Sequence, residues 1–129
     1  MANLRRYAKS HEWIRIEGTL GYVGISDHAQ KEVTDVVYVE LPKTGKAVKA
    51  GEEATTMESV KAAFSIYAPV SGTITKTNAA LEGDPGLINR SPHEEGWMFA
   101  MEVANPSEAD ALMTEEQYQE FLKNGAAAH

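Results

Sequence analysis

The chain contains no cysteine among its 129 residues. Disulfide bonds, thiolate metal ligands and cysteine nucleophiles are therefore excluded. Any thiol or disulfide chemistry would have to come from a group that is attached to the protein. The absence of cysteine is also compatible with a reducing compartment.

A long apolar run and an excess of positive charge are missing as well. No apolar segment is long enough to cross a bilayer, and Arg5 and Arg6 are not followed by the apolar stretch of a secretory signal. We therefore expect no membrane association and a cytoplasmic location, or the mitochondrial matrix if the chain is a processed eukaryotic protein. The 12 basic and 19 acidic residues give a formal net charge of −7, which disfavours nucleic acid as a partner.

The common signatures of catalysis are also absent. No Walker loop, GxSxG elbow or GxGxxG motif is present, and the GDPG run at 83–86 reads as a turn. His11, His28, His93 and His129 show no HExxH or other metal-ligand spacing. We predict no catalytic residue, no metal site and no enzymatic activity of its own.

Strand patterns dominate the chain up to about residue 104. Segments 13–16 and 20–25 flank a glycine-containing turn and predict a hairpin, and segment 36–41 is the strongest strand. Two short segments, 45–51 and 71–78, resemble each other weakly on either side of residue 61. Short strands bounded by Gly, Pro or Asn predict a mainly β fold, a small flattened barrel or sandwich.

Helical signals are confined to two places. Asp27 and Gln30 have the spacing of a capping box and predict a short helix near residues 27–33. Near the C-terminus, Ser107 is a candidate N-cap, and Thr114 with Gln117 forms a second capping box.

The remaining segments complete the predicted domain. Segment 80–95 reads mostly as loop, with Leu87 and Ile88 as its anchor, and 97–103 reads as a buried strand. Asn124–Gly125 ends the C-terminal helix, and a tail follows. We predict one domain over 1–129, with a core of about 10–104 and a C-terminal helical segment of about 107–124.

Lys61 stands between two strand-like segments, in the run Glu58-Ser59-Val60-Lys61-Ala62. This pattern places a single lysine at the tip of a hairpin, where an enzyme can recognise it and attach a cofactor. Val60 and Ala62 are small neighbours that leave the amine accessible. A sulfur-containing group on this lysine would supply the chemistry that the chain itself lacks.

Several motifs occur together and in order along nearly the whole chain. They are SHEW (10–13), GISDHAQ (24–30), DVVYVELP (35–42), ESVKA (58–62), APVSG (68–72), PGLIN (85–89) and GW (96–97). In these motifs the chain resembles the H protein of the glycine cleavage system, a carrier of lipoyl-lysine. The resemblance implies a hybrid barrel-sandwich fold of the lipoyl/biotinyl type, and lipoate in amide linkage to Lys61.

The resemblance also implies a set of partners. A pyridoxal-phosphate glycine decarboxylase would transfer the aminomethyl remnant of glycine to the lipoyl arm. An aminomethyltransferase would pass the one-carbon unit to tetrahydrofolate, and dihydrolipoamide dehydrogenase would reoxidise the arm. Lipoate attachment enzymes would modify Lys61. The carrier itself would act as a tether that raises the effective concentration of its cargo at each partner's site.

Roles for neighbouring residues follow from the same resemblance. Glu58 would help attachment enzymes to recognise the hairpin, or it is simply a solvated turn carboxylate. Ser10 and Glu12 match positions that line a cleft where the loaded arm parks, and the Glu12 carboxylate would pair with the ammonium of the cargo. Alternatively, Glu12 is an exposed charge at a strand end. Ser65 lies where the family commonly has aspartate, so the cleft would lack one carboxylate.

Two further departures from the family pattern concern Thr34, where glycine is usual, and His93, where tyrosine is usual.

Two other functions remain open on sequence alone. A biotin carrier shares the hairpin lysine, but biotin domains usually have methionine on both sides of it, unlike Val60 and Ala62. A lipoyl donor or relay protein outside glycine catabolism would have the same motifs.

Overall fold

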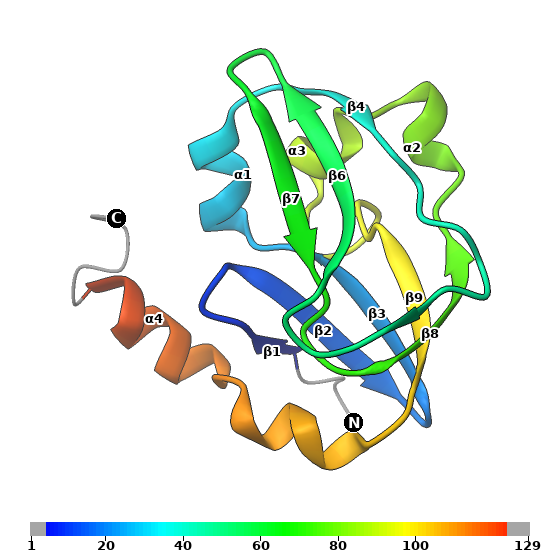
Figure 1. The fold of residues 1–129 in the computed structure, drawn as a ribbon. Coiled ribbons are helices and arrows are strands. Elements are labelled where there is room, and N and C mark those ends of the chain that lie inside the picture. Colours follow the sequence, from blue (N-terminus) through cyan, green and yellow to red (C-terminus); the bar gives the residue numbers. More distant parts are fainter. Residues whose placement is uncertain (1–4, 124–129) are drawn as a thin grey trace.

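Two antiparallel sheets form the body of the protein in the computed structural model, which describes residues 5–123 (Figure 1). The larger sheet has the strand order β1 (Arg5–Tyr7), β2 (Glu12–Glu17), β3 (Leu20–Ile25), β9 (Phe99–Val103), β8 (Gly72–Thr77), β5 (Ala47–Val48). The smaller sheet has the order β4 (Val36–Val39), β6 (Glu53–Ser59), β7 (Ala63–Tyr67). The predicted mainly β, hybrid barrel-sandwich fold is confirmed.

Alternation of side chains along the strands builds the core. In β8, Gly72 and Ile74 are buried whereas Thr73 and Thr75 are exposed, as expected when successive residues face opposite sides of a sheet. Strands of both sheets contribute to one buried apolar cluster, which includes Ile14, Val23, Met57, Ile66, Ile74 and Met101. The tight turn between β2 and β3 uses Gly18 at a φ of +69°, a conformation that glycine adopts readily.

The two segments that resemble each other weakly in sequence lie side by side in the structure. β5 pairs with β8 in antiparallel register, with Val48 opposite Gly72. The β6–β7 hairpin lies between them in the chain and projects away from the larger sheet (Figure 1). Pairing of its flanking strands therefore fixes the base of the lysine hairpin.

The first helix, α1 (Asp27–Val33), occurs where it was predicted, but its cap differs. Ser26 is the N-cap, and its Oγ accepts the N–H of Ala29 at 3.1 Å. The Asp27 carboxylate accepts instead from the Gln30 side-chain amide at 2.9 Å and lies 3.1 Å from the Lys31 ammonium. The prediction that Asp27 caps the helix was wrong, because Asp27 is its first residue and Ser26 is the cap before it.

Segment 80–95 is more ordered than its loop-like composition predicted. It contains two one-turn helices, α2 (Ala80–Gly83) and α3 (Leu87–Arg90). Ile88 is fully buried, in agreement with its predicted anchoring role, and Leu81 is a second anchor that the sequence reading missed. One buried residue per turn is enough to dock such short helices.

The C-terminal segment also confirms one cap and corrects another. Asn105, and not Ser107, caps the 3₁₀-helix η1 (Pro106–Ala111), because its carboxamide oxygen accepts the Ser107 N–H at 3.2 Å. Helix α4 (Glu115–Lys123) begins with the predicted capping box, in which Thr114 and Gln117 exchange hydrogen bonds of 3.0 and 3.2 Å. The predicted stop at Asn124–Gly125 and the tail lie outside the described residues. Within residues 5–123, no helix has the length and apolarity needed to span a membrane.

Candidate functional site

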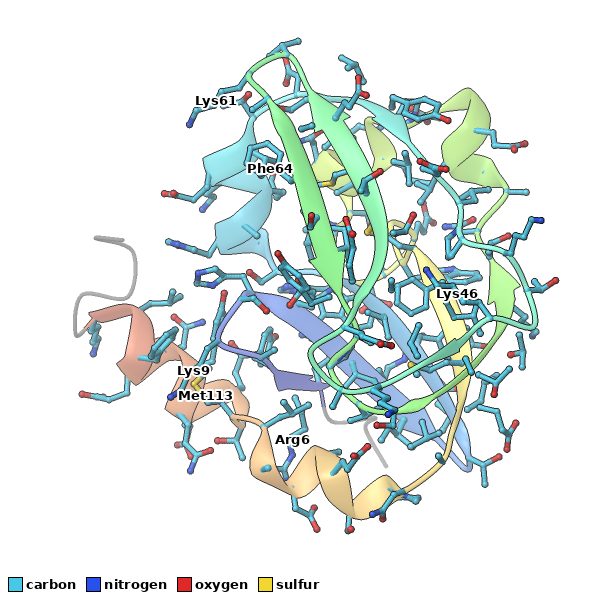
Figure 2. The ribbon with its side chains drawn as sticks, in the orientation of Figure 1. Arg6, Lys9, Lys46, Lys61, Phe64 and Met113 are labelled. Carbon is cyan, nitrogen blue, oxygen red and sulfur yellow. The ribbon has the colours of Figure 1, made fainter. Side chains whose placement is uncertain are left out.

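Lys61 lies at the tip of the β6–β7 hairpin, as the sequence predicted (Figure 2). The Ser59 hydroxyl oxygen accepts the backbone N–H groups of Lys61 and Ala62 at 3.0 and 3.3 Å, so this buried serine organises the turn. Lys61, Ala62 and Glu58 are exposed, and Val60 is 69% exposed. The Val60 N–H donates to the Asp35 carbonyl at 3.0 Å and ties the tip to the segment that follows α1.

The Lys61 side chain reaches the C-terminal end of α1. Its Nζ donates to the backbone carbonyl of Glu32 at 3.2 Å. The last carbonyls of a helix have no partner within the helix and carry partial negative charge, so they favour a cation. The lysine amine is thus exposed, and it is directed towards α1.

A cleft of about 200 Å³ lies between α1 and the hairpin strands. Its apolar lining consists of Ile25, Ala29, Val33, Met57, Phe64, Ile66. Its polar lining consists of Ser10, His11, Glu12, His28, Glu32, Ser65. Figure 2 shows Phe64 on β7, below Lys61 and on the side of α1. All three residues that the sequence assigned to a parking cleft therefore line one cavity.

Glu12 is buried, with 2% of its surface exposed, so the alternative of an exposed strand-end charge was wrong. One carboxylate oxygen accepts the Ser10 hydroxyl and the other accepts the Tyr67 N–H at 2.9 Å. Burial raises the pKa of the Glu12 carboxyl, while these two hydrogen bonds lower it to a smaller extent. Within the described part of the chain no cation forms a salt bridge with this carboxylate.

Ser65 contributes less to the cleft than Glu12 does. It is exposed, and its hydroxyl donates to the Glu53 carboxylate at 2.8 Å, across from β7 to β6. Phe64 and Ile66, its neighbours along β7, are more buried, as expected from strand alternation. The structure therefore brings Ser10 and Glu12 into contact, whereas the Ser65 hydroxyl is hydrogen-bonded to Glu53 instead.

Sequence reasoning missed several residues of this site. His11 and His28 lie together in the cleft lining, with ring centroids 4.9 Å apart. Burial is the main cause that lowers the pKa of His11, and the neighbouring His28 adds to it. The only available signal for His11 was its place within the SHEW motif, because its other partner, Tyr118, is far away in the sequence.

The Lys61 cleft is not the largest hollow of the protein. A groove of about 650 Å³ follows the β4–β5 connection and the start of β6, and none of its lining residues belongs to the hairpin tip. Among residues 5–123, no three histidine, aspartate or glutamate side chains are placed to hold a metal ion. The Lys61 cleft brings together an exposed amine at its border, apolar side chains and a buried carboxylate.

Comparison with known proteins agrees with this geometry. The glycine cleavage system H protein of Xanthobacter autotrophicus is 50% identical over 117 residues, which cover 91% of this chain and 94% of that protein. The mitochondrial glycine cleavage system H protein of Flaveria trinervia is 46% identical over 125 residues, covering 96% and 76%.

A solved structure gives the same result. The crystal structure of a glycine cleavage system H protein from Mycobacterium marinum superposes with a TM-score of 0.80 at 33% identity, covering 97% of this chain and 99% of that one. The sequence model of the glycine cleavage H-protein family matches residues 5–125. The chain belongs to the glycine cleavage H-protein family, the lipoyl carriers of the glycine cleavage system.

Proposed function

We propose that Lys61 is the lipoyl attachment residue and that the chain acts as a carrier without catalytic activity of its own. The observation that carries this proposal is the position of Lys61. It is exposed at the hairpin tip, and its amine donates to the carbonyl of Glu32, a residue that lines the cleft of the buried Glu12 carboxylate. Glu58, Val60 and Ala62 form the exposed surface that an attachment enzyme would meet. Lipoate would be joined through an amide bond to Nζ.

The cleft fits a long arm that carries a cationic cargo. Strand β7 spans about 16 Å from the turn that holds Lys61 to Tyr67, whose N–H holds Glu12. The lysine side chain is too short to cover this distance, so a long attached group is needed to bring a cargo to Glu12. The apolar lining would accept the aliphatic part of the arm.

When bound, lipoate supplies the disulfide and dithiol chemistry that a chain without cysteine lacks. The protein's own residues orient and shield the cargo. The Glu12 carboxylate would accept a charge-assisted hydrogen bond from the ammonium of the aminomethyl cargo, while Ser10 holds the carboxylate in place. Phe64 and Ile66 would exclude water from the same region.

The partners follow from the family role. They are glycine decarboxylase, aminomethyltransferase, dihydrolipoamide dehydrogenase and lipoate attachment enzymes. We assign the whole chain to one lipoyl-carrier domain. We also place it in the cytoplasm of a bacterium or, for a processed eukaryotic chain, in the mitochondrial matrix.

Intact-mass analysis and peptide mapping after lipoylation test the attachment residue. One lipoyl group should be found, and it should be on Lys61. Lys61→Arg should fold normally and remain unmodified, whereas Lys49→Arg and Lys76→Arg, which change other exposed lysines, should be lipoylated like the parent. A biotinyl adduct, or lipoate on Lys49 or Lys76, would contradict the proposal.

A further inference from the structure

Tyr118 connects the C-terminal helix α4 to the Lys61 cleft. Its side chain is 2% exposed, and its hydroxyl oxygen lies 2.6 Å from Ser26 Oγ and 2.7 Å from His11 Nδ1. Burial raises the pKa of Tyr118 to about 12, so the phenol keeps its proton at physiological pH. One hydroxyl group is therefore hydrogen-bonded to two different segments of the chain.

These contacts form a closed ring. The Ser26 N–H donates to the His11 carbonyl at 2.9 Å, and the side chains of the same two residues meet at the Tyr118 hydroxyl. Ser26 is also the N-cap of α1, since its Oγ accepts the Ala29 N–H. The Tyr118 hydroxyl thus joins the turn before β2 to the start of α1, the elements that supply two walls of the cleft.

The turn before β2 needs such a restraint. His11 has a φ of +79°, a left-handed conformation that is unfavourable for a residue with a Cβ. His11 lies between Ser10 and Glu12 in the chain, and the hydroxyl of Ser10 donates to the carboxylate of Glu12 across it. A change at the His11 ring is therefore expected to move the group that would face the cargo.

We propose that the Tyr118 hydroxyl is a positioning group of the carrier, because it holds His11 and thereby the Ser10–Glu12 pair that retains the cargo. Tyr118 itself does not line the cleft. None of the cleft-lining residues comes from the described part of α4. This helix meets the cleft lining at His11, whose ring also lies 6.3 Å from the Phe121 ring, centroid to centroid, but the hydrogen bond to His11 comes from Tyr118. The inference rests on the proposed function of Lys61 and the cleft.

Tyr7 provides a matched control. It is 1% exposed, and its ring stacks on Tyr118 with centroids 4.3 Å apart and an angle of 5° between the planes. Its hydroxyl donates to Glu115 at 2.6 Å, on α4, and not to a residue of the cleft. Tyr7→Phe and Tyr118→Phe therefore each remove one buried phenolic hydroxyl from the same aromatic cluster.

Two measurements distinguish positioning from general stability. In the unmodified protein, the ¹⁵N chemical shifts of the His11 ring should change in Tyr118→Phe, since Nδ1 loses its partner, and should stay as in the parent in Tyr7→Phe. In lipoylated protein loaded with glycine and glycine decarboxylase, Tyr118→Phe should release formaldehyde spontaneously about fivefold faster, the effect of one lost hydrogen bond. Tyr7→Phe should release formaldehyde at the parent rate, even if its unfolding temperature falls as much as that of Tyr118→Phe.

A second variant tests whether the effect passes through His11. His11→Gly removes the ring and relieves the backbone strain, since glycine adopts a positive φ readily, and adding Tyr118→Phe to it should cause no further acceleration. Equal acceleration by both tyrosine variants, additive effects with His11→Gly, or an unchanged release rate in Tyr118→Phe would overturn the positioning role. Failure of the proposed function would be recognised separately. Lys61 would then carry no lipoate, whereas the ¹⁵N chemical shifts of the His11 ring would still change in Tyr118→Phe.

Discussion

One oxygen of the buried Glu12 carboxylate accepts the backbone N–H of Tyr67 at 2.9 Å. This hydrogen bond fixes the start of β2 to the end of β7, the strand that begins just after the Lys61 turn. The buried carboxylate and the attachment hairpin are therefore positioned by the same strand. The hydrogen bond holds the Glu12 carboxylate at the end of β7 that is farther from the Lys61 turn.

Replacement of Glu12 by alanine should shorten the lifetime of the loaded carrier. A charge-assisted hydrogen bond contributes about 1.5–3 kcal/mol, so its loss should accelerate spontaneous release of formaldehyde and ammonia about tenfold or more. Lipoylation of Lys61 should proceed at the parent rate, because attachment enzymes meet the exposed hairpin tip. Glu58→Ala, at an exposed carboxylate beside that tip, is the matched control and should leave release unchanged. Parent-like release kinetics in Glu12→Ala would assign Glu12 a purely structural role.

Replacement of Glu12 by glutamine should stabilise the unmodified protein at neutral pH. Burial raises the pKa of Glu12 above its ordinary value of 4.5, so the folded state binds the proton more tightly than the unfolded state. The contribution of Glu12 to stability is therefore fully present below pH 4.5 and is lost as the pH rises through the folded-state pKa. Glutamine keeps the shape and removes the charge. Its oxygen can accept the Tyr67 N–H while its amide group donates to the Ser10 hydroxyl, which can also act as an acceptor.

Thermal unfolding of both proteins at several pH values measures this difference. We expect Glu12→Gln to have the higher Tm at pH 7, with a gap that shrinks towards pH 4. The difference between the two proteins isolates Glu12, since all other titrating groups are common to both. A gap that grows on acidification would show that the hydrogen bonds from Ser10 and Tyr67 outweigh the effect of burial.

The sequence was sufficient to predict those parts of the site that consist of residues close together in the chain. The Lys61 hairpin depends on local pairing of β6 with β7, so the tip and its neighbours could be located directly. The Glu12 carboxylate was assigned to the cleft only through family resemblance, and its burial could not be predicted. A charged residue at the start of a strand is usually exposed, and its burial here depends on Tyr67, which is far away in the sequence.

Long-range side-chain contacts explain what the sequence did not reveal. His11 and Tyr118 meet only after the C-terminal helix has packed against β1, and neither residue belongs to a motif that indicates the contact. The short helices α2 and α3 were missed for a related reason. Each is one turn long and is held by one buried residue, Leu81 or Ile88, so no helical periodicity could develop.

Thr34 is a site of backbone strain, and glycine should stabilise the protein there. It follows α1 with φ +66° and ψ −153°, a region that is populated almost only by glycine. Relief of the strain should exceed the added entropy of glycine in the unfolded chain, so we expect Thr34→Gly to raise the free energy of unfolding by about 1 kcal/mol. Thr73→Gly, at an exposed position inside β8, should lower it. Chemical denaturation of the three proteins gives both values, and a destabilised Thr34→Gly would show that the Thr34 side chain outweighs the strain.

The Ser65 position offers a way to strengthen retention of the cargo. The Ser65 hydroxyl donates its only proton to Glu53, so it has lone pairs but no charge to offer an ammonium group. Aspartate here adds a carboxylate at the rim of the cleft. If the new ion pair contributes about 1 kcal/mol, Ser65→Asp should slow spontaneous release about fivefold.

Glu53 determines how much of this gain is realised. In Ser65→Asp, the new carboxylate would face the carboxylate of Glu53 across the β6–β7 pair, and like charges on neighbouring strands repel. The double variant Glu53→Gln/Ser65→Asp should therefore release the cargo more slowly than Ser65→Asp alone, and Glu53→Gln alone should behave like the parent. High salt should reduce the slowing, because the pair lies at an exposed position. Release rates from the four loaded proteins decide the question, and equal rates would mean that position 65 does not contact the parked arm.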